Sequence, residues 1–202
     1  MDRVLVLYPT LFRCESKFRR KLDAITDRMK VFDLVFPADP NRFVERYAEC
    51  TDKVIAISDD PDWKVKASIS HAIAFDDGEE FEKEREWLQE NDIPTRWIRT
   101  PLTRVINLKK EPKYQERKKT ATYEYIGRGS KWGNSYSMFE KNESREEVIR
   151  KYQYDFERDL LPRFTKADVL ELSGKRLGCF CAPAACHGDV LADYLNAHDD
   201  EK

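Results

Sequence analysis

The sequence predicts an α/β protein in which a Rossmann-like three-layer domain is followed by a small α/β domain. Short, unbroken apolar runs such as Val4–Leu7 and Val54–Ile57 alternate with amphipathic stretches of helical length through the first hundred residues. Such alternation indicates parallel strands that are joined by right-handed crossovers. The second half has its own order of strand, glycine-rich loop and helices. We therefore expect one domain over residues 1–102 and another over residues 103–202.

The spacing of apolar residues assigns the elements of the first half. The expected strands are Val4–Leu7, Val31–Phe36, Val54–Ile57 and Thr95–Ile98. The expected helices are one with Phe18, Leu22, Ile25 and Met29, one with Phe43, Val44 and Tyr47 after Asp39-Pro40, one with Val65, Ile69, Ala72 and Ile73 after Asp60-Pro61, and one over Glu79–Glu90. Ligands of such sheets bind beyond the carboxyl ends of the strands. The sequence contains no G-x-G-x-x-G motif and no P-loop, so the usual cradle for a dinucleotide or triphosphate is missing.

The second half begins with a basic segment and then returns to regular structure. The segment carries Lys109, Lys110, Lys113, Arg117, Lys118 and Lys119. A charge run of this kind is typical of a solvated loop, with contact to a nucleic-acid backbone as the alternative. The elements expected after it are a strand at Tyr123–Ile126, a long helix that begins with a Ser144/Glu147 capping box, a short helix that ends near Gly174, a strand at Arg176–Cys181 and a closing helix with Val190, Leu191, Tyr194 and Leu195.

Composition and charge exclude several classes of protein. The chain has 202 residues, of which 41% are hydrophobic and 37% charged, as expected of a folded protein. Its 36 Lys and Arg residues nearly balance 38 Asp and Glu residues, so any anion binding must be local. The longest apolar run, Val4–Tyr8, is too short for a membrane span, and the amino terminus lacks the features of a signal peptide. We expect a cytoplasmic protein, in the host cytoplasm if the chain is viral, with no membrane partner.

The first candidate motif runs from Tyr125 to Asn134 and contains three glycines. Glycines let the backbone approach a ligand closely, and Arg128 and Lys131 supply the charge that an anionic group needs. Trp132 offers a flat face for a base or a sugar. The alternative is a tight turn whose Trp132 fills the core and whose cations are solvated. The residues expected to bind substrate are Gly127, Arg128, Ser130, Lys131, Trp132, Asn134 and, from the second motif, Cys181.

The second candidate motif is the segment from Cys179 to Asp189, which holds three of the five cysteines. Five is an odd number, and three cysteines within eight positions do not resemble a disulfide framework. A thiol at a helix N-terminus has a lowered pKa, because the helix dipole and unpaired N–H groups favour the thiolate. We therefore predict that Cys186 is a nucleophile and that His187 transfers protons. Asp189 either assists them or caps the helix.

The same four soft side chains also allow a metal site. Cys179, Cys181, Cys186 and His187 lie within nine residues. Zinc usually takes cysteines from knuckles with two to four residues between them, so the C-x-C spacing is unusual for zinc but does not exclude it. A structural zinc therefore remains an alternative to free thiols, and Cys179 is equally consistent with a small buried apolar side chain.

Four motifs in order resemble the family of domains of unknown function numbered 4326. They are Thr103-Arg104-Val105-Ile106-Asn107, Tyr125-Ile126-Gly127-Arg128 with Lys131-Trp132-Gly133-Asn134, Arg145–Ile149 through Tyr152, and Cys179-Phe180-Cys181 with Pro183, Cys186–Asp189 and Leu191. The resemblance covers about Thr103 to Asn196 and implies a bacteriophage or bacterial mobile-element setting. Ser135 departs from it, since a proline commonly follows the Gly-Asn pair. The Cys-His loop is also similar, more weakly, to the family numbered 488. Neither resemblance implies a particular reaction.

These observations predict an enzyme that acts on a phosphate-bearing nucleotide, a nucleoside derivative or a nucleic-acid end, by hydrolysis or group transfer. Arg128 and Lys131 hold the anion, and Cys186 and His187 carry the chemistry without a cofactor. Its partner is then a nucleotide or another phosphorylated small molecule. The alternative is a non-catalytic module that binds nucleic acid or a protein and is held together by zinc.

Overall fold

The computed structural model describes residues 1–66, 68–114, 119–138 and 142–201. The chain divides into two compact units, Met1–Pro101 with Ala197–Lys202, and Leu102–Asn196. The expectation that the second domain continues to residue 202 is therefore wrong. Two ion pairs explain the difference, since Asp199 pairs with Arg20 at 2.6 Å and Asp200 pairs with Lys17 at 2.8 Å.

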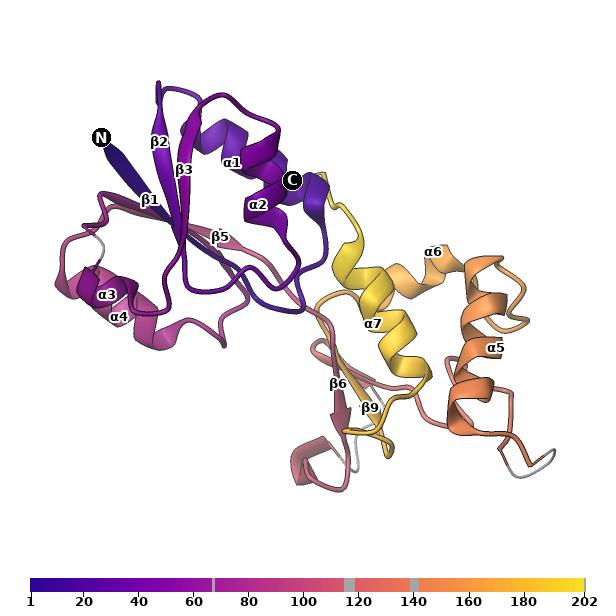
Figure 1. Ribbon diagram of the computed structural model, residues 1–202. Helices are drawn as coiled ribbons and strands as arrows, with labels where there is room; N and C mark the ends of the chain where they lie inside the picture. Colours follow the sequence, from indigo (N-terminus) through magenta and orange to yellow (C-terminus); the bar gives the residue numbers. More distant parts are fainter. Residues whose placement is uncertain (67, 115–118, 139–141, 202) are drawn as a thin grey trace. The chain divides into compact units, whose positions relative to one another are not determined.

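The first unit is built on five parallel strands in the order β3-β2-β1-β4-β5 (Figure 1). The strands are β1 (Asp2–Leu7), β2 (Phe32–Phe36), β3 (Val54–Asp59), β4 (His71–Asp76) and β5 (Thr95–Arg99). The helices are α1 (Glu15–Thr26), α2 (Phe43–Glu49), α3 (Trp63–Lys66) and α4 (Glu82–Glu90). This arrangement confirms the predicted Rossmann-like α/β class.

Helices cover the two faces of this sheet in pairs, with α1 and α2 on one side and α3 and α4 on the other (Figure 1). On the first side, Phe18 of α1 stacks on Phe75 of β4 with ring centroids 5.1 Å apart. On the second side, Trp63 and Leu88 pack with a cluster that includes Trp97 of β5. Side chains alternate along a strand, so Arg96 and Ile98 of β5 belong to the α1 side.

Strand β4 corrects one prediction. The sequence pattern placed Ala72 and Ile73 on a helix with Val65 and Ile69, but the helix is only α3, and Ala72–Phe75 belongs to a buried strand. A strand that is buried on both faces has no polar alternation, so its apolar run also fits a helical spacing. The other predicted strands of this unit are present.

Two aspartates fix the turns after β2 and β3. The Asp39 carboxylate accepts hydrogen bonds from the backbone N–H groups of Val44 at 3.2 Å and Glu45 at 3.0 Å, so it caps α2. Pro40 precedes the helix, which begins at Phe43. Asp60 accepts a hydrogen bond from the N–H of Asp62 at 3.0 Å and caps the turn before α3.

The second unit contains a four-stranded sheet in the order β6-β9-β8-β7. Its strands are β6 (Arg104–Asn107), β7 (Lys119–Thr120), β8 (Tyr123–Tyr125) and β9 (Arg176–Cys179). Its helices are α5 (Arg145–Glu157), α6 (Lys166–Val169) and α7 (His187–Ala197), with short 3₁₀ turns at Pro112–Tyr114 and Leu170–Leu172. Strands β6, β9 and β8 are parallel and β7 is antiparallel, so β8 and β9 end at the same edge.

Local sequence fixes the two helices that border this edge. Helix α5 begins after Ser144, whose Oγ accepts a hydrogen bond from the N–H of Glu147 at 3.1 Å, as predicted. Helix α7 packs its second residue, Gly188, against the sheet. A Cβ at Gly188 would lie 2.5 Å from Cδ1 of Ile126 and 3.1 Å from Cγ2 of Val105, so only glycine allows this approach.

The predicted basic segment is only partly visible, because Arg117 and Lys118 lie outside the described residues. Lys119 forms ion pairs with Glu124 at 3.5 Å and Glu171 at 3.4 Å. None of the helices within the described ranges is both long and apolar enough to cross a membrane.

Candidate functional site

A pocket of about 230 Å³ in the second unit brings the two sequence motifs together. It lies beyond the carboxyl ends of β8 and β9, the place where parallel α/β sheets build ligand sites. The residues predicted from sequence that line it are Gly127, Arg128, Asn134, Cys179, Cys181, Cys186 and His187. The Arg128 and Cys186 side chains thus border the same pocket.

Trp132 does not take part in this pocket. Its side chain is only 1% exposed, and its ring packs against Phe164 with centroids 4.8 Å apart. Its Nε1–H donates a hydrogen bond to Oε1 of Glu124 at 3.3 Å. The predicted stacking of a base on Trp132 is therefore wrong, and the alternative, in which the indole fills the core, is correct.

Lys131 and Ser130 also lie away from the pocket. The Lys131 ammonium pairs with Glu171 at 3.0 Å and lies 4.3 Å from the centroid of the Trp132 ring. Ser130 belongs to the turn, where its N–H donates to the carbonyl oxygen of Gly127 at 3.0 Å. The predicted anion cradle is thus wrong for Lys131, because the ammonium group of Lys131 already pairs with the Glu171 carboxylate.

Asn134 lines the pocket, but both ends of its amide are occupied by the backbone. Its Nδ2 donates to the carbonyl oxygen of Val148 at 3.0 Å, and its Oδ1 accepts from the N–H of Tyr136 at 2.8 Å. Asn134 therefore ties the glycine-rich loop to α5. This positioning role replaces the direct substrate contact that the sequence suggested.

Arg145 is the cation that sequence reasoning missed. It is the first residue of α5 and lines the pocket together with Arg128. Its guanidinium donates to the carbonyl oxygen of Ala185 at 3.2 Å and contacts the Cys181 thiol. The sequence could have indicated a role for Arg145 at the site, because Arg145 directly follows the Ser144 cap and the first turn of a helix faces the loops that build a site.

Aromatic side chains form the walls of the pocket. Tyr125 and Phe180 meet edge to face with centroids 6.4 Å apart, and Phe180 is 54% exposed. Tyr136 lines the pocket and donates its hydroxyl hydrogen to Asp155 at 2.6 Å. Exposed rings at a rim that also carries arginines suit a ligand with a flat ring and an anionic group.

Three thiols converge at one end of the pocket. The sulfur atoms of Cys179, Cys181 and Cys186 all lie within 4.8 Å of one another, and none is in a disulfide. Cys179 and Cys186 are buried, whereas Cys181 is partly exposed. The N–H of Gly188 donates to Sγ of Cys186 at 3.3 Å, so the first turn of α7 does reach the cluster.

The ionisation of the cluster differs from the prediction. A hydrogen bond from Cys186 lowers the pKa of Cys179, and the N–H and thiol of Cys181 lower it further. The same hydrogen bond to Cys179 raises the pKa of Cys186, and burial raises it more. The geometry therefore makes Cys179 the thiolate and Cys186 its thiol donor. The raised pKa of Cys186 runs against the prediction that this thiol ionises near neutral pH, because Cys186 donates to the sulfur beside it.

His187 and Asp189 are held by the backbone. The His187 Nε2 lies 2.8 Å from the carbonyl oxygen of Ile126, which fixes the proton on Nε2. Burial lowers the pKa of His187, so its imidazole is neutral at neutral pH. Asp189 does not line the pocket, and its carboxylate accepts from the N–H of Cys186 at 2.7 Å. Asp189 thus caps α7, which is the alternative that the sequence offered.

The three sulfur atoms also fit a mononuclear metal ion in size. Zinc–sulfur bonds of about 2.3 Å in a tetrahedron place the sulfurs about 3.8 Å apart, and those of this cluster lie within 4.8 Å of one another. His187 is not part of the group, because its ring nitrogens do not lie within 4.8 Å of all three sulfurs. Of the four predicted zinc ligands, three converge.

Comparison with known proteins assigns both halves of the chain. Residues 1–106 match the minimal SLOG domain. The chain belongs to the minimal SLOG family. SLOG domains are Rossmann-like and are associated with nucleotide-related ligands. Residues 106–197 of this SLOG protein match the domain of unknown function numbered 4326, which confirms the resemblance seen in the sequence.

A bacteriophage protein is similar to part of this SLOG protein. It is a 12.4 kDa protein from the nrdA-td intergenic region of Enterobacteria phage T4, with 42% identity over 72 residues. These residues make up 35% of the chain and 65% of the phage protein. No solved structure matches the chain.

Proposed function

We propose that the second unit is an enzyme domain that acts on a phosphate-bearing nucleotide, a nucleoside derivative or a nucleic-acid end. The observation that carries this proposal is the joint presence of Arg128, Arg145 and the thiol cluster around one pocket. The first unit matches the minimal SLOG domain, and the association of SLOG domains with nucleotide-related ligands supports a nucleotide-related role for the chain.

Each part of the pocket has a distinct task in this proposal. Arg128 and Arg145 hold the phosphate, because a guanidinium binds phosphate oxygens in a bidentate way. Tyr125 and Phe180 contact the base or the sugar. The volume of about 230 Å³ is below the range of about 300–1,000 Å³ that is typical of sites for drug-sized ligands, so part of the nucleotide remains at the open rim.

The chemical step belongs to the thiol cluster. Cys179 lines the pocket and is the nucleophile, with Cys186 as the hydrogen-bond donor that stabilises its thiolate. The neutral imidazole of His187 lines the same pocket and is available as a base. Arg145 contacts Cys181 and thereby links the anion-binding end of the pocket to the sulfurs.

A thermal-shift screen of the full chain with nucleoside mono-, di- and triphosphates tests the proposal. A ligand at about a hundred times its dissociation constant stabilises the folded state by about 2.7 kcal/mol, which is a readily measured shift. We expect at least one nucleotide to stabilise the wild type and to lose this effect in Arg128→Gln. A folded protein that no nucleotide or phosphosugar stabilises would refute the proposal.

The second candidate function is a binding module whose sulfurs hold a structural zinc. The convergence of three sulfurs within 4.8 Å favours it. Cys179, Cys181 and Cys186 would be the protein ligands, and the fourth position would face the pocket. Such a site would stabilise the fold directly, because metal binding is coupled to folding.

Metal content separates the two candidates. Elemental analysis of the purified chain, with Cys181→Ser and Cys14→Ser as a matched pair, is the direct experiment. One zinc per chain that is lost with stability only in Cys181→Ser favours the zinc module. Metal-free, folded protein in which iodoacetamide modifies Cys179, and does so more slowly when a nucleotide is bound, favours the enzyme.

A further inference from the structure

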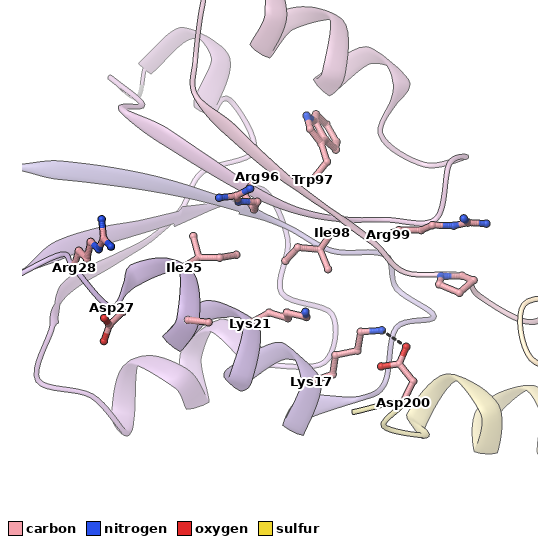
Figure 2. A pocket seen from close by; sticks show the side chains of 12 residues that line it. Lys17, Lys21, Ile25, Asp27, Arg28, Arg96, Trp97, Ile98, Arg99 and Asp200 are labelled. Carbon is pink, nitrogen blue, oxygen red and sulfur yellow. Dashed lines mark hydrogen bonds and ion pairs between the residues drawn. The ribbon is translucent and has the colours of Figure 1, made fainter. Parts of the chain in front are cut away.

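We propose that the first unit binds single-stranded nucleic acid in a groove between helix α1 and the edge strand β5, here called the α1–β5 groove (Figure 2). The groove lies wholly within the first unit, so this inference does not depend on the function of the pocket in the second unit. It is also separate from the turns after β2 and β3, where Asp39 and Asp60 have capping roles.

The groove is open because none of the helices in the described part of the chain covers this part of the sheet. Helix α1 packs on the centre of the sheet through Phe18 and Leu22, which are both fully buried. Strand β5 is the edge of the sheet and turns Arg96 and Ile98 toward the α1 side. Figure 2 shows Ile98 pointing toward Lys21 and Ile25 of α1 across the open space, whose volume is about 1060 Å³.

The groove is strongly cationic in a chain whose net charge is −2. Five of its lining residues are cations and two are carboxylates, namely Lys17, Lys21, Arg28, Arg96 and Arg99 against Asp27 and Asp200. Lys17 is buried and pairs with Asp200 at 2.8 Å, as the dashed line in Figure 2 shows.

The other four cations are uncompensated. Within the described part of the chain, Lys21, Arg28, Arg96 and Arg99 have neither an ion pair nor a hydrogen bond through their side chains. Lys21 stands on α1 and Arg28 follows the end of this helix, whereas Arg96 stands on the β5 wall (Figure 2). Arg99 alternates with Ile98 along β5 and therefore leaves the strand on the same face as Trp97. Most other arginines of the first unit, such as Arg42 with Glu45 and Arg85 with Asp76, do have acidic partners. Uncompensated cations on both walls favour an anionic occupant.

The shape of the groove favours an extended occupant. A second hollow of about 310 Å³ shares Ile25 and Arg96 with it and continues along the sheet to His71 and Pro94. Together the two hollows follow the whole length of β5, from Pro94 to Pro101. A mononucleotide would fill only part of this length, whereas a polyanion can follow both rows of cations.

The floor of the groove suits exposed bases. Ile25, Ile98 and Pro101 provide apolar surface between the cations. Trp97 points to the other side of the sheet in Figure 2, where the guanidinium of Arg85 lies 3.8 Å from its ring centroid. Because an acidic peptide lacks flat groups along its length, and a duplex stacks the faces of its bases inside, a single strand matches both features best.

Fluorescence anisotropy of the full chain with a labelled oligothymidylate tests this site. For single strands, log K falls against log salt with a slope of about −0.7 per phosphate contact, so three contacts give a slope of about −2.1. We expect K21Q/R28Q to reduce the magnitude of this slope by about 1.4 and to weaken binding by about tenfold or more at about 50 mM salt. R96Q, from the opposite wall, should act in the same direction and reduce the magnitude of the slope by about 0.7.

The matched control is K109Q/K110Q, which removes the same charge from two exposed lysines of the basic segment in the second unit. It should leave affinity and slope unchanged, and all variants should keep the melting temperature of the wild type, because the substituted side chains have no described partner. The proposal fails if no oligothymidylate binds. It also fails if a duplex or polyglutamate binds as tightly, or if the control pair weakens binding as much as K21Q/R28Q.

Discussion

Burial decides which residues of the glycine-rich motif can meet a ligand. Arg128 is exposed and lines the pocket, whereas Trp132, four residues later, is buried in the core. The sequence alone could not separate these roles, because an indole that follows a glycine-rich turn can either contact a ligand or pack in the core. Likewise, the ion pair of Lys131 with Glu171 joins residues that are forty positions apart, and no local pattern predicts it.

Replacement of Trp132 by Phe tests its assignment to the core. The variant loses the hydrogen bond to Glu124 and leaves a small cavity beside Phe164. We expect the free energy of unfolding, measured with urea, to fall by about 1–3 kcal/mol. The nucleotide affinity of the folded variant should equal that of the wild type. Lower affinity at unchanged stability would instead place the indole at the ligand.

The cysteines show a similar limit of sequence reasoning. Their convergence follows from one strand end and one helix start, and both elements were predictable. The sequence could not predict which sulfur is ionised, because this depends on which thiol donates a hydrogen bond and which sulfur accepts it. Cys179 receives hydrogen bonds from both other cysteines, and this outweighs the position of Cys186 at the helix N-terminus.

Among the elements, the predictable ones have strong local signals. Val4–Leu7 and Val54–Ile57 are bounded apolar runs, and both lie in strands. The helix start at Ser144 follows from its capping pattern. Strand β4 was missed because its apolar residues continue the helical spacing of Val65 and Ile69, and only pairing with β1 and β5 makes it a strand.

Helix α5 should depend measurably on its cap. Ser144→Ala removes the acceptor for the N–H of Glu147, which should lower the free energy of unfolding by about 1 kcal/mol. Since Arg145 follows directly, the variant should also bind nucleotide more weakly. Ser135→Ala, at an exposed loop position, is the control for both measurements. Equal effects of the two substitutions would show that the cap neither stabilises α5 nor positions Arg145.

At the scale of the whole molecule, the chain returns to its first unit after completing the second. Residues 197–202 belong to the first unit through contacts with α1. The domain division expected from composition and motifs could not include this return, because it rests on ion pairs between residues about 180 positions apart. The two units are nevertheless consistent with the two family matches, which meet at residue 106.

Asp199→Asn tests this return through its pH dependence. Hydrogen bonds from Ser16, from the N–H of Glu201 and from Arg20 lower the pKa of Asp199 from 3.8 to about 2. A carboxylate with a lowered pKa in the folded state stabilises the protein above its unfolded pKa, and this stabilisation is lost as the pH falls. The difference in stability between wild type and variant should therefore be constant above about pH 5 and shrink toward pH 2.

Asp52→Asn serves as the control, since Asp52 is an exposed carboxylate elsewhere in the first unit. Urea titrations at several pH values give the required differences. If the wild type and Asp199→Asn differ by the same amount at pH 2 and at pH 7, the ion pair with Arg20 does not hold residues 197–202 to α1.

The central claim is that Arg128 and Arg145, and not Lys131, hold the phosphate of a nucleotide at the thiol pocket. Calorimetric titration of the best nucleotide from the thermal-shift screen into the wild type, Arg145→Gln and Lys131→Gln tests it most directly. A lost hydrogen bond to a charged group costs about 1.5–3 kcal/mol, so Arg145→Gln should bind about 10- to 150-fold more weakly. Lys131→Gln should bind as the wild type does, because Glu171 already holds that ammonium. Equal loss in both variants, or unchanged binding by Arg145→Gln, would contradict the account.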